Sequence, residues 1–298
     1  MNTNVSVHAG MAGSDRPRPA LTSAARPATF MVDAIDEKGQ VVPTPIAGEH
    51  PLTIYLDRRE LVTLMTLGAA PEALAIGYLR NQRIVSTIDE IAAVQVDWET
   101  SSVAVTTGTG LHWDDPEAAA MLERKTVTTG CGQGTVFGDL MEAIDDIHLP
   151  ESARLTQEVL YTVMERVRKH ESIYKQAGAV HGCALCSNTG ESRGEILYFV
   201  EDVGRHNAVD AIAGRMWLDG VDGGDKIFYT TGRLTSEMVI KCAQMGIPIL
   251  LSRSGLTQMG HDIATRVGIT MVGRCQGRHY LLFTGGHRFV APARTLFA

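Results

Sequence analysis

The chain has few cysteines, no excess of basic residues and no long uninterrupted run of apolar residues. Five cysteines in 298 residues are too few for a disulfide framework, so we expect a reducing compartment. The formal net charge of −7 argues against a general nucleic-acid binder, because phosphate contacts need a basic surface. The longest apolar run, residues 61–79, is broken by Gly68, Pro71 and Glu72, so no membrane span is expected. These absences favour a cytoplasmic enzyme or carrier.

Composition and periodicity divide the chain into four segments. Residues 1–28 are rich in Ala, Ser, Pro, Arg and Gly and predict a disordered tail. Residues 29–125 predict a smaller α+β region, in which strands 52–56 and 61–65 form a hairpin. Its other elements are a helix over 71–82, strands over 91–96 and 102–106, and a short helix over 116–124. Residues 126–150 hold a mobile glycine-rich loop and a helix over 136–147, and residues 151–298 form the largest domain.

This last domain begins with a long helix over 156–174 and then alternates strand with helix. The expected strands are 195–200, 226–229, 247–251 and 269–272, with helices 207–218, 236–245 and 258–267 between them and a last strand over 279–283. Such alternation predicts an α/β fold with a mainly parallel sheet and helices on both faces. In such sheets ligands bind beyond the carboxyl ends of the strands.

Arginines follow four of these strand ends. They are Arg205, Arg233, Arg253, and Arg274 with Arg278. A single arginine in such a loop is most often an ordinary surface residue, but recurrence at the same end of every strand favours one anion-binding cleft. Arginine with Ser, Thr and glycine backbone N–H groups is typical of phosphate recognition. No glycine pattern matches a Rossmann or Walker fingerprint.

The segment His181-Gly-Cys183-Ala-Leu-Cys186 resembles part of a zinc site. No second ligand pair follows at a conventional spacing, and Cys183 stands where a zinc deaminase has its glutamate. We therefore favour a buried strand with small thiol side chains over a metal site. Cys242, on the helix over 236–245, is expected in the core.

Cys131 lies in the stretch Thr126-Val-Thr-Thr-Gly-Cys-Gly-Gln-Gly-Thr-Val-Phe-Gly138, the most flexible backbone of the chain. A buried structural cysteine usually has apolar neighbours, which this one lacks. Arg124, Lys125 and the start of the expected helix near Val136 would lower the pKa of its thiol. Cys131 is therefore the candidate nucleophile.

Several of these motifs together resemble the formate dehydrogenase accessory sulfurtransferases, the FdhD family, over about residues 49–284. They are Pro51-Leu-Thr-Ile-Tyr55, Gly130-Cys-Gly132, Gly178-Ala-Val-His181, Glu201-Asp-Val-Gly-Arg-His-Asn-Ala-Val-Asp210, Thr231-Gly-Arg233 with Glu237-Met238, Gly246-Ile-Pro-Ile249 and Ser252-Arg-Ser254. The resemblance implies a cytidine-deaminase-like three-layer α/β/α domain without the catalytic zinc. It also implies a homodimer that takes sulfur from a cysteine desulfurase. The family delivers that sulfur to molybdenum bis(molybdopterin guanine dinucleotide), which the catalytic subunit of formate dehydrogenase needs in sulfurated form.

The resemblance carries roles over to particular residues. Cys131 matches the persulfide-forming cysteine, although the family commonly reads Cys-Gly-x-Cys and this chain has Gly134 at the second cysteine. Cofactor contacts are expected on the loop between the last two strands, which the commoner family form opens with an aromatic residue instead of Arg274. The expected cofactor-binding residues are Arg274, Cys275, Gln276, Gly277, Arg278 and His279, with Arg205, His206, Arg233 and Arg253 at the same sheet edge.

Two further functions stay open. A chaperone could hold the guanine dinucleotide cofactor and its apoenzyme without moving sulfur, and it would need the cleft but not Cys131. A zinc deaminase is disfavoured by the missing glutamate. The sequence names neither the client dehydrogenase nor the donor desulfurase, and it does not say which part of the cofactor each arginine contacts.

Overall fold

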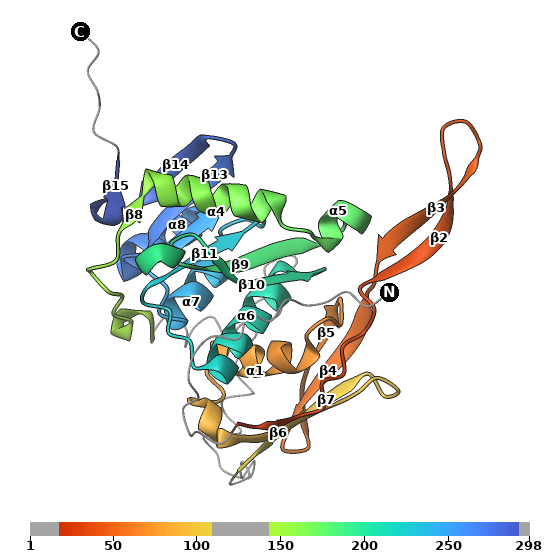
Figure 1. The fold of residues 1–298 in the computed structure, drawn as a ribbon. Coiled ribbons are helices and arrows are strands. Elements are labelled where there is room, and N and C mark those ends of the chain that lie inside the picture. Colours follow the sequence, from red (N-terminus) through yellow and green to blue (C-terminus); the bar gives the residue numbers. More distant parts are fainter. Residues whose placement is uncertain (1–17, 109–142, 292–298) are drawn as a thin grey trace.

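The computed structural model describes residues 18–108 and 143–291, and these build two main sheets joined by packed helices (Figure 1). The expected helix over 116–124, most of the one over 136–147, and the loop with Cys131 lie outside the described residues. The end of that second helix is a 3-10 turn at Ala143–Asp146.

The N-terminal sheet has five strands in the order β1-β6-β7-β4-β5. Their bounds are β1 (Ala20–Leu21), β4 (His50–Leu56), β5 (Arg59–Thr66), β6 (Ile91–Asp97) and β7 (Ser102–Thr107). Apolar and polar residues alternate along β4, so Leu52, Ile54 and Leu56 are buried while their neighbours are not. The predicted hairpin is confirmed as β4 and β5, which pair antiparallel.

Part of the expected disordered tail is ordered. β1 pairs parallel with β6, and the backbone N–H of Ala24 donates to Glu72 at 2.8 Å. The indole of Trp98 donates to the carbonyl of Ala24. These bonds hold residues that composition alone assigned to the tail.

Helix α1 (Pro71–Asn81) joins the two halves by packing against α6 (Arg205–Asp219). A Cβ at Gly77 would stand 1.6 Å from the carbonyl oxygen of Asp210, and one at Gly214 would stand 2.0 Å from that of Ala73. The two backbones therefore touch at these glycines, and side chains from both halves share one hydrophobic core.

The second sheet has six strands in the order β10-β9-β11-β12-β13-β14. Their bounds are β9 (His181–Ser187), β10 (Ile196–Asp202), β11 (Lys226–Thr230), β12 (Ile249–Ser252), β13 (Thr270–Gln276) and β14 (His279–Thr284). The expectation of a mainly parallel sheet is wrong. Only β11, β12 and β13 are neighbours in parallel, because β9 runs antiparallel between β10 and β11 and β14 returns antiparallel beside β13.

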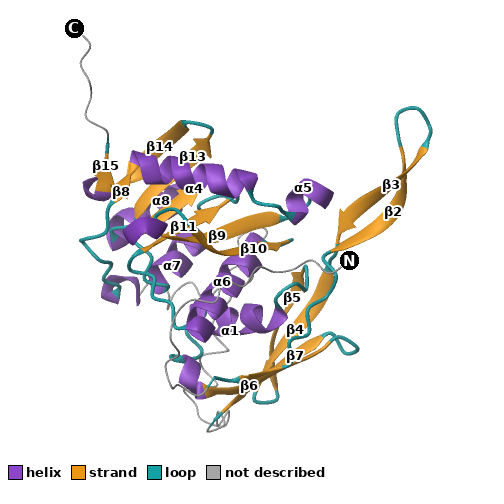
Figure 2. Cartoon of the chain, in the orientation of Figure 1, coloured by secondary structure: helices purple, strands orange, loops and turns teal. Residues whose placement is uncertain are grey.

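Helices cover both faces of this sheet, as expected (Figure 2). α6, α7 (Ser236–Gln244) and α8 (Gln258–Val267) pack on one face, and α4 (Gln157–Lys169) packs on the other. The single helix expected over 156–174 is two helices, α4 and α5 (Ile173–Ala177). The break occurs because the Ser172 side chain accepts from the N–H of Lys175 and starts a new helix.

The remaining strands form an antiparallel hairpin, β2 (Thr29–Ile35) and β3 (Val41–Ala47), which extends away from the body (Figure 1). This hairpin was not predicted. A short pairing of β8 (Leu155–Thr156) with β15 (Phe289–Val290) ties the start of α4 to the C-terminal region. None of the helices in the described part of the chain combines the length and apolarity that a membrane crossing needs.

Candidate functional site: a cationic, aromatic cavity at the sheet edge

Alternation along β9 separates two chemically different faces of the six-stranded sheet. Cys183 packs into the core beneath α6 and α7, whereas Ala184 and Cys186 pack beneath α4. The strand is buried throughout apart from His181, which confirms the buried strand predicted for this segment. Among the described residues, no three metal-ligating side chains gather in one place.

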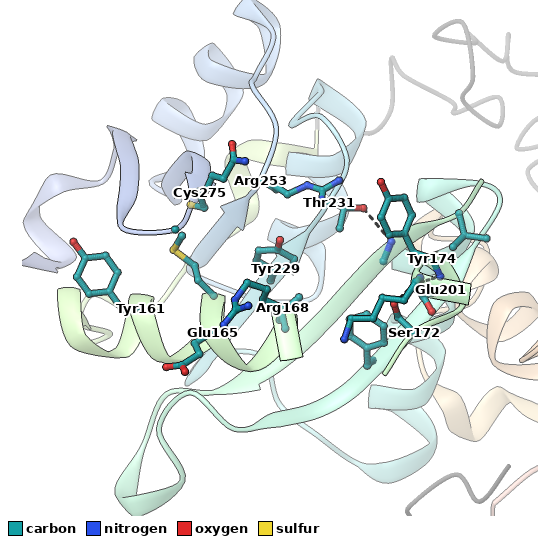
Figure 3. A pocket seen from close by; sticks show the side chains of 18 of the residues that line it. Tyr161, Glu165, Arg168, Ser172, Tyr174, Glu201, Tyr229, Thr231, Arg253 and Cys275 are labelled. Atoms are coloured by element: carbon teal, nitrogen blue, oxygen red, sulfur yellow. Dashed lines mark hydrogen bonds between the residues drawn. The ribbon is translucent and has the colours of Figure 1, made fainter. Parts of the chain in front are cut away.

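A cavity of about 560 Å³ opens on the α4 face, at the carboxyl ends of β10, β11 and β12 (Figure 3). This volume lies within the range of ~300–1,000 Å³ that is usual for small-molecule sites. Its lining residues come from α4, α5 and the residue before it, the start of β9, the ends of β10, β11 and β12, and the end of β13 with the β13–β14 turn. They are Tyr161, Met164, Glu165, Val167, Arg168, Ser172, Tyr174, Lys175, Val180, Gly182, Phe199, Glu201, Tyr229, Thr231, Arg253, Cys275, Gln276, Gly277 and Arg278.

The lining is rich in basic and aromatic side chains. Four basic side chains, from Arg168, Lys175, Arg253 and Arg278, outnumber two acidic ones, from Glu165 and Glu201. The guanidinium of Arg253 lies 5.6 Å from the ring of Tyr174, and that of Arg278 lies 5.8 Å from the ring of Tyr161. A planar, anionic ligand suits such a lining, because rings stack and guanidinium groups bind phosphate.

Glu201 builds one wall of the cavity. Its carboxylate accepts from the backbone N–H groups of Ile173 at 2.5 Å and Tyr174 at 3.2 Å, so it anchors the start of α5 to β10. Burial raises the pKa of this carboxyl, and the two N–H donors oppose that rise. Glu201 therefore acts on the site mainly by holding Tyr174 and Lys175 at the rim.

Only part of the loop that was expected to contact the cofactor lines this cavity. Cys275, Gln276, Gly277 and Arg278 line it, and Arg274 and His279 do not. Arg274 has a left-handed backbone, with φ of 54°, and its N–H donates to the carbonyl of Ser254 at 2.9 Å. The Tyr161 hydroxyl donates to the carbonyl of Arg278 at 3.2 Å, so α4 fixes the turn that presents this arginine.

Arg205 and His206 do not line the cavity. Both are buried at the start of α6, on the opposite face of the sheet. His206 Nε2 lies 3.3 Å from a carboxylate oxygen of Glu237 at the start of α7. Burial first, and then the positive charges of Lys241 and Arg205, lower the pKa of His206 to about 2. His206 is therefore neutral at physiological pH.

The predicted gathering of arginines at one sheet edge is nonetheless visible around His181. Burial lowers the pKa of this half-buried histidine, and the positive charges of Arg205, Arg233 and Arg253 lower it further. Arg233 and Arg253 are exposed at this edge, and Arg253 alone of the three reaches the cavity. Positive charge therefore gathers around His181 at this edge.

The motif Glu201–Asp210 also ties the two halves of the molecule together. The Asp202 carboxylate accepts from the Thr66 hydroxyl at 2.5 Å, the Leu67 N–H at 3.0 Å and the Asn207 amide at 2.7 Å. The Asp210 carboxylate accepts from the Asn81 amide at 2.7 Å and from the ammonium of Lys241 at 2.8 Å, and the side chains of Asp210 and Lys241 are both fully buried. Much of this motif therefore stabilises the fold.

The described cysteines are poor nucleophiles. Cys183, Cys186, Cys242 and Cys275 are all free and buried. Burial raises the pKa of Cys183, Cys186 and Cys275 to about 12 and that of Cys242 well above its ordinary value. A thiol with such a pKa forms almost no thiolate at neutral pH. Cys131 lies outside the described residues.

Sequence reasoning missed the contribution of α4 and α5 to the cavity. Tyr161, Glu165 and Arg168 recur at helical spacing on the face of α4 that looks along the sheet toward this edge (Figure 3). Their spacing of three and four residues was the available signal, since it places an aromatic and two charged residues on one stripe beside the buried valines.

Comparison with known proteins places the chain in a family. A model of the FdhD/NarQ family matches residues 47–290. The chain is 31% identical over 251 residues to a sulfur carrier protein FdhD of Listeria monocytogenes, covering 84% of this chain and 93% of that protein. It is 26% identical to a sulfur carrier protein FdhD of Bacillus subtilis, covering 85% and 94% of the two chains.

The fold also matches a solved structure. A crystal structure from Desulfotalea psychrophila, described as that of a candidate formate dehydrogenase accessory protein, superimposes with a TM-score of 0.69 and 26% identity. The match covers 89% of this chain and all of that one. The chain therefore belongs to the FdhD/NarQ family, with a role in sulfur transfer and formate dehydrogenase maturation.

Proposed function

We propose that this protein accepts sulfur from a cysteine desulfurase as a persulfide on Cys131. In this step the Cys131 thiolate attacks the outer sulfur of the donor's persulfide, and the donor's cysteine leaves as a thiolate. The cytoplasm supplies the reducing compartment that such a persulfide carrier needs. The sulfur then passes to molybdenum bis(molybdopterin guanine dinucleotide), which is the substrate of the transfer.

One observation supports Cys131 above all others. The four described thiols are buried and hold their protons, so none is suited to attack a donor persulfide. Cys131 has glycines on both sides and two basic residues shortly before it in the sequence, which is the setting of a reactive cysteine.

The cavity on the α4 face is the proposed place for the guanine nucleotide part of the cofactor. Its tyrosines can stack on a planar base, and Arg253 and Arg278 can pair with a diphosphate. Gly277 has φ of 61° at the β13–β14 turn and no described atom within 4 Å of its absent Cβ, so the backbone leaves room for a ligand there.

The alternative is a chaperone that binds the same cofactor without carrying sulfur. A maturation assay separates the two functions, with formate dehydrogenase activity measured in cells that depend on this protein. We expect the Cys131→Ser variant to abolish activity and the Cys183→Ala and Cys186→Ala variants to retain most of it. Full activity with Cys131→Ser, together with unchanged GDP binding, would favour the chaperone.

A further inference from the structure

One wall of the cavity is formed by α5, which few contacts hold to the rest of the molecule. Ser172 and Tyr174 (Figure 3), together with Lys175, line the cavity from the N-cap and first turn of this helix. No side chain of α5 is buried, and Tyr174 is 51% exposed. Segments with few buried apolar contacts open most readily, and ligand-binding loops often belong to this class. α5 is therefore the part of the cavity wall best suited to move.

The connections on either side of α5 have the geometry of a hinge. Two successive left-handed residues, Gly178 with φ of 65° and Ala179 with φ of 56°, join α5 to β9. Ala179 thus holds a backbone conformation that residues with a side chain rarely adopt, as hinge and clamp residues often do. On the other side, α4 ends at His170, whose ψ of 132° leaves the helical region. Changes of φ and ψ at a few such residues are enough to swing a short helix as a unit.

The start of α5 is fastened to the sheet by Glu201, which is 8% exposed near the end of β10. Its carboxylate accepts from the N–H groups of Ile173 and Tyr174, at 2.5 and 3.2 Å. N–H groups in the first turn of a helix have no acceptor within the helix, and their bonds to an ionised carboxylate are stronger than bonds between neutral groups. We call this pair of bonds the Glu201 latch.

The other polar contacts of α5 are weaker. Lys175 Nζ lies 3.7 Å from the carboxylate of Glu171, whose side chain is 88% exposed, and exposed ion pairs contribute little to stability. The same Nζ donates to the carbonyl of Lys169 at 3.2 Å. On its outer side α5 lies beside β3 of the projecting hairpin (Figure 1), and β3 has no buried side chain of its own. Within the described part of the chain, the Glu201 latch is thus the strongest polar restraint on α5.

The position of α5 decides how much of Arg253 a ligand can reach. The Arg253 guanidinium lies 5.6 Å from the Tyr174 ring, and both residues line the cavity. A cation is attracted to the face of an aromatic ring. With the latch engaged, Tyr174 therefore occupies one side of the guanidinium that is proposed to pair with a diphosphate. Movement of α5 frees that side.

We propose that α5 is a lid on the cavity, that it swings on residues 170 and 178–179, and that Glu201 latches it in the closed position. Entry and release of a nucleotide both require the latch to open. Glu201 is a positioning residue, because it acts on the ligand only through α5. The role of the lid in nucleotide exchange rests on the function proposed above, whereas the opening of α5 does not.

The rates of nucleotide exchange test the lid. The probe is GDP that carries a fluorescent N-methylanthraniloyl group, mixed with the protein in a stopped-flow instrument. We expect Glu201→Ala to raise the association and dissociation rates together by about tenfold to a hundredfold, because the two charge-assisted bonds set the population of the open state. The dissociation constant should change less than either rate. A residue that only improves the bound geometry would alter dissociation and leave association unchanged.

Two further variants separate the latch from a general loss of charge. Glu201→Gln keeps the shape of the side chain and one acceptor oxygen, so both rates should rise by less than in Glu201→Ala. Glu171→Gln is the matched control, because it also removes a glutamate that contacts α5, but only at the exposed surface. It should change either rate by less than about threefold.

Electron paramagnetic resonance measures the opening of α5 without a ligand. Spin labels are attached to Gln176→Cys, exposed on α5, and Thr265→Cys, exposed on α8, in a Cys131→Ser background. We expect one narrow distance distribution between the labels in the otherwise unaltered protein and in Glu171→Gln. Glu201→Ala should add a second, broader population, which GDP should diminish.

Three outcomes would contradict some part of this account. The latch is wrong if the distance distribution stays narrow in a Glu201→Ala or Glu201→Gln variant that circular dichroism shows to be folded. The lid is wrong if α5 opens in these variants while both nucleotide rates stay the same, or if only dissociation changes. Failure of the unaltered protein to bind the labelled GDP would instead contradict the proposed nucleotide site, and the spin-label distances would still decide whether Glu201 latches α5.

Discussion

The two faces of the six-stranded sheet differ in where their charged side chains lie: in an open cavity on one face and in a buried ion pair on the other. On the α4 face, Arg168, Arg253 and Arg278 line an open cavity. On the α6–α7 face, Lys241 and Asp210 are fully buried and bonded to each other, and Glu237 lies beside them. The same sheet edge thus presents basic groups that are available to a ligand on one side and charges that are satisfied internally on the other.

This difference follows from which helices cover each face. α6 and α7 pack closely enough to exclude water, so a charge there must find a partner within the protein. α4 lies beside this edge with Tyr161, Glu165 and Arg168 toward the cavity, and the strand ends there remain open (Figure 3). Ligand binding and fold stability should therefore respond to different substitutions, from the largest effect to the smallest as follows.

Loss of Lys241 should affect stability most. The Lys241→Met variant leaves the Asp210 carboxylate buried without its cation, and we expect it to lose about 3–5 kcal/mol of unfolding free energy. Lys175→Met, on the cavity side and paired only at the surface, should lose less than about 1 kcal/mol. Urea unfolding of both variants measures the contrast. Equal losses would mean that the two faces do not differ.

For ligand binding, substitutions in the cavity should have the larger effect. We expect Arg278→Ala to weaken binding of GDP, used as a fragment of the cofactor, by about tenfold to a hundredfold without unfolding the protein, because it removes a charge-assisted contact. Arg253→Ala should act similarly.

Arg233→Ala is the matched control for GDP binding, since Arg233 is exposed at the same sheet edge but does not line the cavity. It should change the dissociation constant less than about threefold. Calorimetric titration decides between them, and a larger loss with Arg233→Ala than with Arg278→Ala would place the nucleotide outside the cavity.

Acid should destabilise the protein through His206. Its pKa is lowered to about 2 in the folded state, from about 6.5 when unfolded, so the unfolded chain binds the extra proton between these values. The stabilising effect of neutral His206 is complete above pH 6.5 and is lost as pH falls below it. Its slope approaches ~1.4 kcal/mol per pH unit.

The effect of His206 must be separated from those of Asp210 and Asp202, whose pKa values are raised. Comparing the unaltered protein with the His206→Gln variant at each pH does this. Burial is the largest cause of the lowered pKa of His206; the charged groups that add to it are Lys241, Arg205, His181 and Arg233, and Glu237 faces the ring from α7. The unfolding free energies of the unaltered protein and of His206→Gln should converge as pH falls from 6.5 to 5. Parallel curves would mean that His206 is charged in the folded state.

The smallest expected effect concerns bound zinc, of which the purified protein should hold very little. His181, Cys183 and Cys186 come from one extended strand, and alternation sends the two thiols to opposite faces of the sheet. We expect well under one zinc per chain in the purified protein by metal analysis. Stoichiometric zinc that survives mild chelation would contradict this reading of β9.

The sequence predicted most of the elements but fewer of their relations. Strands and helices between residues 195 and 284 repeat regularly, so their periodicity identifies them, as does the buried strand with Cys183 and Cys186. The direction of β9 was not predictable, because a strand reads the same whether its neighbours are parallel or antiparallel. The β2–β3 arm escaped notice because prolines at 43 and 45 are untypical of a strand interior and its apolar residues face water.

The candidate site was predicted in part for a similar reason. Strand ends correctly indicated the edge where Arg253, Cys275 and Arg278 meet. They did not indicate on which face each side chain lies, which depends on the register of strands far apart in sequence. Arg205 and His206 therefore joined the expected set, although α6 buries them beneath the opposite face.

The central claim is that Cys131 carries the sulfur and that the buried thiols do not. Mass spectrometry can map the added sulfur after incubation of the protein with a cysteine desulfurase and cysteine. The account predicts the mass of one extra sulfur atom on the peptide that contains Cys131, and none on those with Cys183, Cys186, Cys242 or Cys275. Added sulfur on Cys186 or Cys275, with Cys131 unmodified, would contradict it.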